Sequence, residues 1–129
     1  MYWERIVNAW LIAAGLAAAC CWVIHTFVGE RTVARPLVAS ADLEAVAKWT
    51  QFYCWHLVTI TLAVMALGLG YAAFVPAALD VALLIAALAI AFGLFGIVLP
   101  RRIGRSYAEM PQGFLLLPIG LLALVGALA

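Results

Sequence analysis

The sequence predicts an all-α integral membrane protein, a four-helix bundle with both termini on the periplasmic side. Two observations predict the membrane class: 69% of the 129 residues are hydrophobic and 10% are charged, and the mean hydropathy is +1.18. Soluble domains average about 25% charged residues, so this chain has too few polar side chains to coat a water-facing exterior. The third observation is that the charged residues divide the chain into four uncharged runs.

Each uncharged run has the length of a membrane-spanning helix. A spanning helix needs about 20 apolar residues, because each residue advances about 1.5 Å through hydrocarbon about 30 Å thick. Backbone polar groups in lipid must also find their hydrogen bonds inside the protein, which favours helices. We therefore expect one transmembrane domain over residues 1–129, with spans at about 7–28, 50–73, 77–99 and 112–129.

Glycine and proline residues mark the expected helix ends. Gly29 suits the left-handed position that follows the first helix, and Pro36 fits a loop, where its missing N–H does no harm. Pro100 fits the end of the third helix and Pro111 the start of the fourth. Pro118, inside the fourth helix, should produce a kink.

Basic residues predict the orientation. Six of the seven Lys and Arg residues fall in the expected connections near residues 30–48 and 101–112, and Arg5 falls on the opposite side. The positive-inside rule then places both connections in the cytoplasm and both termini in the periplasm. We expect three of these residues to contact anionic lipid head groups: Arg101, Arg102 and Arg105.

Three short segments have a residue pattern that is more specific than hydrophobicity alone. Residues 25–29 are H-T-F-V-G, residues 35–37 are R-P-L, and residues 54–59 are C-W-H-L-V-T. This succession, in the first half of the chain, resembles a group of small, uncharacterised bacterial four-helix inner-membrane proteins. The resemblance implies a multi-pass protein of the bacterial cytoplasmic membrane and implies no activity.

The two histidines are the main candidates for a functional site, because ionisable groups within spans are costly. Helical rise places His25 about 6 Å and His56 about 10 Å from the expected cytoplasmic boundary. Helices joined by a modest loop are usually neighbours, so the two imidazoles could approach each other. We expect a polar site formed by His25, Trp55, His56 and Thr59 that binds a hydrophobic molecule such as a quinone or a lipid.

Other roles for the histidines remain open. Thiolate and imidazole groups suit copper or zinc, which makes Cys21, His25 and His56 candidate metal ligands. The two histidines could instead hold a haem between two helices. In a purely structural role, each imidazole would bond a neighbouring carbonyl group or head-group water.

The sequence contains no Ser/His/Asp grouping and no phosphate-binding glycine loop. We therefore expect a non-enzymatic protein in the lipid bilayer, either an accessory subunit of a larger membrane complex or a binder of a hydrophobic ligand. The alternative is a small transporter, in which Asp80 or a histidine would carry protons. Small residues four apart, such as Gly15 and Ala19, would allow close helix packing or a homo-oligomer. The net charge of +1 argues against nucleic acid as a partner.

Overall fold

The structure is a computed structural model that describes residues 7–129, all of whose long elements are helical. The expected all-α class is confirmed, whereas Arg5 lies outside the described residues. In chain order, the elements are α1 (Ala9–Val23), the π-helix η1 (Ile24–Ala34), α2 (Arg35–Ala39), α3 (Ala45–Phe74), the 3-10 turn η2 (Pro76–Ala78), α4 (Leu79–Arg102) and α5 (Gln112–Leu128).

Three helical segments are long and apolar enough to cross a membrane, which indicates a membrane protein. They are Ala9–Ala39, Ala45–Phe74 and Pro76–Arg102. The fourth helix, α5, is apolar but shorter, with 17 residues. That length is at the lower end of the range of about 17 to 25 residues for spanning helices.

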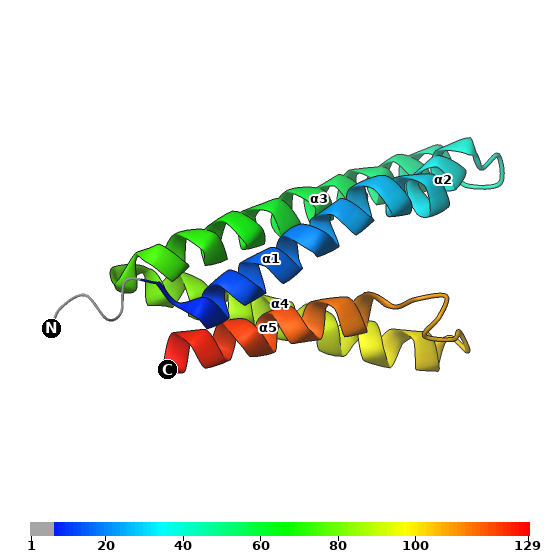
Figure 1. The fold of residues 1–129 in the computed structure, drawn as a ribbon. Helices are drawn as coiled ribbons and strands as arrows, with labels where there is room; N and C mark the ends of the chain where they lie inside the picture. Colours follow the sequence, from blue (N-terminus) through cyan, green and yellow to red (C-terminus); the bar gives the residue numbers. More distant parts are fainter. Residues whose placement is uncertain (1–6) are drawn as a thin grey trace, which may run out of the picture.

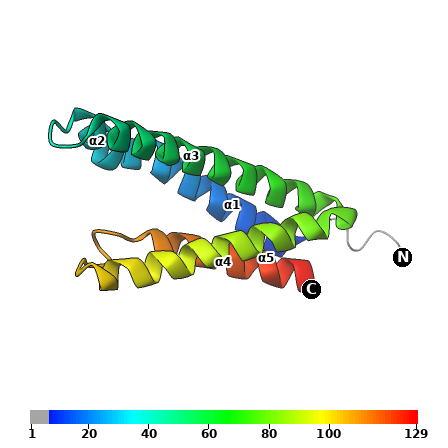
Figure 2. The same cartoon turned by 180° about the vertical axis from the view of Figure 1, so that it is seen from behind.

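The helices form two antiparallel hairpins that meet at one end and diverge at the other (Figures 1 and 2). In one hairpin α1 packs against α3, and in the other α4 packs against α5; α1 also contacts α5, and α3 contacts α4. The turn between α3 and α4 and the end of α5 lie where the hairpins meet. The connections 40–44 and 103–111 lie apart at the diverging end, one on each hairpin.

Asn8 links three helices at the end where the hairpins meet. Its Oδ1 atom accepts a hydrogen bond from the Leu11 N–H (3.1 Å) and caps α1, while its Nδ2 atom donates to the Gly126 carbonyl (2.7 Å). Its backbone N–H donates to the Ala73 carbonyl (2.9 Å). These three bonds fix the start of α1 against the ends of α3 and α5.

Glycines allow α4 and α5 to pack closely. A Cβ atom placed on Gly96 would lie 2.6 Å from the Gly113 nitrogen, and one placed on Gly120 would lie 2.6 Å from the Ile90 side chain. Real Cβ atoms are not found so close to other heavy atoms, so only glycine fits. Lipid supplies no hydrophobic force between helices, so this close backbone contact is a main source of their attraction.

The first helical segment is longer than the sequence predicted. Gly29 lies inside η1, and positive φ among the described glycines occurs at Gly104 (68°), so the expected helix end at Gly29 is wrong. Pro36 lies in α2, which continues directly from η1 in one helical segment, so the expectation that it lies in a loop is also wrong. The expected loop over residues 30–48 therefore shortens to residues 40–44.

The expected proline positions in the second half agree better with the structure. Pro100 lies in the last turn of α4, Pro111 is the N-cap of α5, and Pro118 lies within α5.

We predict that Gly113→Ala lowers the stability of the protein by about 1 to 3 kcal/mol, because the added methyl group overpacks the contact between α4 and α5. Thermal unfolding in mild detergent, followed by circular dichroism, measures this change. Gly70→Ala is the matched control, since a Cβ atom at Gly70 meets nothing within 4 Å. Equal melting temperatures for the two variants would contradict the prediction.

Candidate ligand-binding cleft

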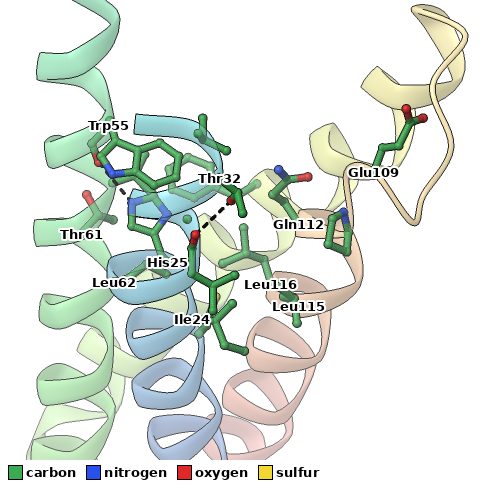
Figure 3. A pocket seen from close by; sticks show the side chains of 17 residues that line it. Ile24, His25, Thr32, Trp55, Thr61, Leu62, Glu109, Gln112, Leu115 and Leu116 are labelled. Atoms are coloured by element: carbon green, nitrogen blue, oxygen red, sulfur yellow. Dashed lines mark hydrogen bonds between the residues drawn. The ribbon is translucent and has the colours of Figure 1, made fainter. Parts of the chain in front are cut away.

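A cleft of about 200 Å³ lies between the two hairpins at their diverging end (Figure 3). Its lining comes from α1, η1, α3, α4, α5 and the connection 103–111. A cavity of about 150 Å³ holds benzene, so this cleft has room for one substituted ring or part of an alkyl chain. Its apolar walls include Ile24, Val28, Val33, Val58, Leu62, Phe92, Leu115 and Leu116.

His25 and Trp55 form a stacked pair on one wall of the cleft (Figure 3). Their ring centroids are 4.0 Å apart and their planes differ by 18°. The Nε2 atom of His25 is 3.3 Å from the Trp55 carbonyl oxygen. A carbonyl oxygen only accepts hydrogen bonds, so Nε2 carries the proton in this contact. The Nδ1 atom of the neutral ring is then left as an acceptor.

The helix η1 and Gly29 make room for this pair. A π-helix is rare, usually occupies a single turn and is often found at functional sites, whereas η1 covers 11 residues. A Cβ atom at Gly29 would lie 2.7 Å from two carbon atoms of the Trp55 indole. The indole therefore rests directly on the Gly29 backbone, which explains why a small residue occupies this helical position.

The polarity of the cleft changes with depth. Thr32, Glu109 and Gln112 line it near the connections 40–44 and 103–111. Leu116 lies one turn, about 6 Å, further along α5 than Gln112, and Leu62 lies about 10 Å beyond Trp55 along α3. At the deep end Thr61 is the polar lining residue, and its hydroxyl donates to the Leu57 carbonyl (2.8 Å) of its own helix. The cleft is therefore polar near the connections and mainly apolar at its deep end.

Glu109 is the charged residue in the cleft lining. Its Oε2 atom accepts hydrogen bonds from the Ser106 N–H (2.9 Å) and the Ser106 hydroxyl (3.0 Å), and Arg105 Nη1 lies 3.4 Å from Oε1. The bonds from Ser106, assisted by Arg105, hold the pKa of this carboxyl below its usual value. Glu109 is therefore a fixed negative charge at neutral pH.

Of the four residues expected to line a polar site, the structure brings His25 and Trp55 together in the cleft lining. His56 is exposed and packs edge-on against Phe52, with centroids 4.5 Å apart. The Thr59 hydroxyl donates to the Trp55 carbonyl (3.2 Å), which the His25 imidazole also contacts. Thr59 thus supports the stacked pair from behind, and neither it nor His56 lines the cleft.

The expected metal ligands do not form a site. Within residues 7–129, no group of three His, Cys, Asp or Glu side chains is placed to hold a metal ion. Cys21 and His25 line the cleft, but His56 does not. A haem between the two histidines meets a further obstacle, because the Trp55 carbonyl engages Nε2 of His25 and the indole covers one face of the ring.

The other residues singled out from the sequence lie away from the deep part of the cleft. Asp80 is exposed in the first turn of α4, at the opposite end of the bundle. Arg101, Arg102 and Arg105 are exposed at the end of α4 and in the connection after it. The Arg101 guanidinium lies over the Tyr107 ring, 5.6 Å from its centroid.

Sequence reasoning did not identify Glu109 and Gln112 as lining residues. Both lie within two residues of Pro111, and this proline correctly marked the start of the last helix in the sequence. What the sequence lacked was a signal that this helix end faces η1 across the bundle.

No protein-family model, curated protein or solved structure matches this chain. The resemblance to small bacterial inner-membrane proteins therefore stays a prediction. The geometry of the cleft is the basis for a functional proposal.

We predict that Trp55→Leu moves the His25 ring-proton resonances downfield, because the stacked indole shields them in the native protein. Proton–carbon NMR of the protein in detergent micelles measures this change, and the chain has two histidines to assign. Trp49→Leu is the control, since Trp49 contacts Phe52 and not His25. His25 resonances that stay unchanged in Trp55→Leu would contradict the stacked arrangement.

Proposed function

We propose that this membrane protein binds an amphiphilic small molecule in the cleft between its two hairpins. The observation that carries the proposal is the change from polar to apolar lining with depth. Ligand sites are generally apolar concavities with a few polar groups that fix the orientation of the ligand. Here Glu109, Gln112 and the His25–Trp55 pair would contact a head group, and Leu62 and Leu116 would contact a chain or ring.

Some residues of the cleft walls are also exposed on the surface of the protein, which supports entry of a ligand from the bilayer. Val28 and Phe92 line the cleft and yet are 55% and 39% exposed. A ligand could therefore insert its polar end and part of its apolar body while the rest of the chain remains in lipid. The volume of about 200 Å³ fits such partial enclosure better than the burial of a whole lipid.

The proposed location is the bacterial cytoplasmic membrane, with the polar end of the cleft on the cytoplasmic side. The basic residues support this orientation, because the connections 40–44 and 103–111 lie at one end of the bundle. Lys48 adds a local contact there, donating to the Val38 carbonyl (3.3 Å) and the Ser40 carbonyl (2.5 Å). Exposed Arg101, Arg102 and Arg105 would contact anionic head groups.

Cysteine labelling tests the orientation in a background that lacks the three native cysteines. We expect an Arg102→Cys thiol to resist a membrane-impermeant maleimide in intact cells and to react after permeabilisation. Ala77→Cys, exposed in η2 at the opposite end, should react in intact cells. The reverse pattern would overturn the proposed orientation.

Photolabelling tests the binding site. The probe is a long-chain alcohol with a diazirine on its chain, added to the protein in phosphatidylcholine nanodiscs, and mass spectrometry locates the labelled residues. We expect saturable labelling in the cleft that Leu116→Trp abolishes, because the larger side chain fills the space. Leu67→Trp is the matched control, since Leu67 is 74% exposed and outside the cleft lining. Unsaturable labelling that Leu116→Trp leaves unchanged would overturn the proposal.

A further inference from the structure

The polar end of the cleft offers hydrogen-bond acceptors from His25, Glu109 and Gln112, and the Gln112 amide also offers two donors. When the His25 ring is neutral, its Nδ1 atom accepts, because Nε2 donates to the Trp55 carbonyl. The Glu109 carboxylate has only acceptor oxygens when ionised. The hydroxyl proton of Thr32 is already donated to the Val28 carbonyl (3.0 Å). A ligand that carries donors therefore finds acceptors at this end, and the charge of its head group decides how well it fits.

The charge of the lining points in the same direction. Glu109 is ionised, and the lining residues include no Lys or Arg. Arg105 pairs with Glu109 at 3.4 Å but is outside the lining, and both side chains are more than half exposed. Arg105 therefore offsets part of the effect of the carboxylate on a head group, and because both charges are exposed the remaining preference should be small. An anionic head group would be repelled by Glu109, and no Lys or Arg side chain in the lining would offset this repulsion.

We propose that the cleft selects amphiphiles with a protonated amine head group. An ammonium group has three donors and a positive charge, which suit the Glu109 carboxylate and the Gln112 side-chain carbonyl on the wall opposite His25. The apolar part of the molecule then extends toward Leu62 and Leu116. This inference rests on the proposed function, because it requires that the cleft bind an amphiphile.

Three photoreactive probes with the same chain and different head groups test this selection. They are the long-chain alcohol, the corresponding primary amine and the corresponding carboxylic acid, each added to phosphatidylcholine nanodiscs at about pH 8, where amine and carboxyl groups of ordinary pKa are ionised. We expect half-saturation of cleft labelling at a concentration about two- to fivefold lower for the amine than for the acid, as one exposed charge contact provides. Equal values, or a lower value for the acid, would overturn the inference.

Three variants assign the selection to Glu109. Glu109→Gln should bring the amine and the acid to equal half-saturation, whereas Asp42→Asn should leave the difference unchanged, because Asp42 lies in the connection 40–44 and outside the lining. Arg105→Gln removes the neighbouring cation and should widen the difference. A preference for the amine that persists in Glu109→Gln, or that disappears in Asp42→Asn, would overturn the assignment to Glu109.

The alcohol probe separates the two proposals. If the alcohol labels the cleft saturably but the amine and the acid are equal, the cleft binds amphiphiles and the inference about the head group is wrong. If none of the probes labels the cleft saturably, the proposed function itself fails.

Discussion

The cleft depends on one constraint: the two hairpins are held together at one end only. Asn8 joins α1, α3 and α5 at that end, and the largest fully buried apolar side chains include Leu11, Met65 and Ile119. Toward the connections 40–44 and 103–111 the hairpins diverge, and side chains that would otherwise meet across the bundle become cleft walls. The cleft therefore forms at the end of the bundle where the two hairpins no longer pack against each other.

Glycine contacts within each hairpin keep those walls in place. The Gly96–Gly113 contact holds α4 and α5 at a separation that any larger residue would increase. Gly29 plays the same part on the other side, since the Trp55 indole lies against its backbone. Because packing in lipid relies on such close approach, a single added methyl group at any of these glycines should change the shape of the cleft as well as the stability of the protein.

The sequence predicted those features that depend on local chemistry. Composition and the spacing of charges were enough for the helical membrane class, and Pro100 and Pro111 marked helix ends because proline acts on its own backbone. Gly29 was misinterpreted because its role depends on Trp55, which comes from another helix. For the histidines, helical rise gave the depth of each ring but not the direction in which it points. A π-helix has more residues per turn than an α-helix, so α-helical spacing does not give the face of η1 on which His25 lies. The sequence spacing alone therefore could not show whether His25 and His56 face each other.

The groups at the polar end of the cleft are fixed by partners in the protein before any ligand arrives. The Trp55 carbonyl sets the proton position on His25, and Ser106 holds the Glu109 carboxylate in its ionised form and in place. Such preorganisation lowers the ordering cost of binding. An amphiphile in the bilayer is also already aligned, with its head group toward the connections and its chain toward the deep end, if the bundle spans the membrane along its long axis. Binding would then require lateral movement of the ligand and little reorientation of either partner, so even a small cleft with weak polar contacts could discriminate between head groups.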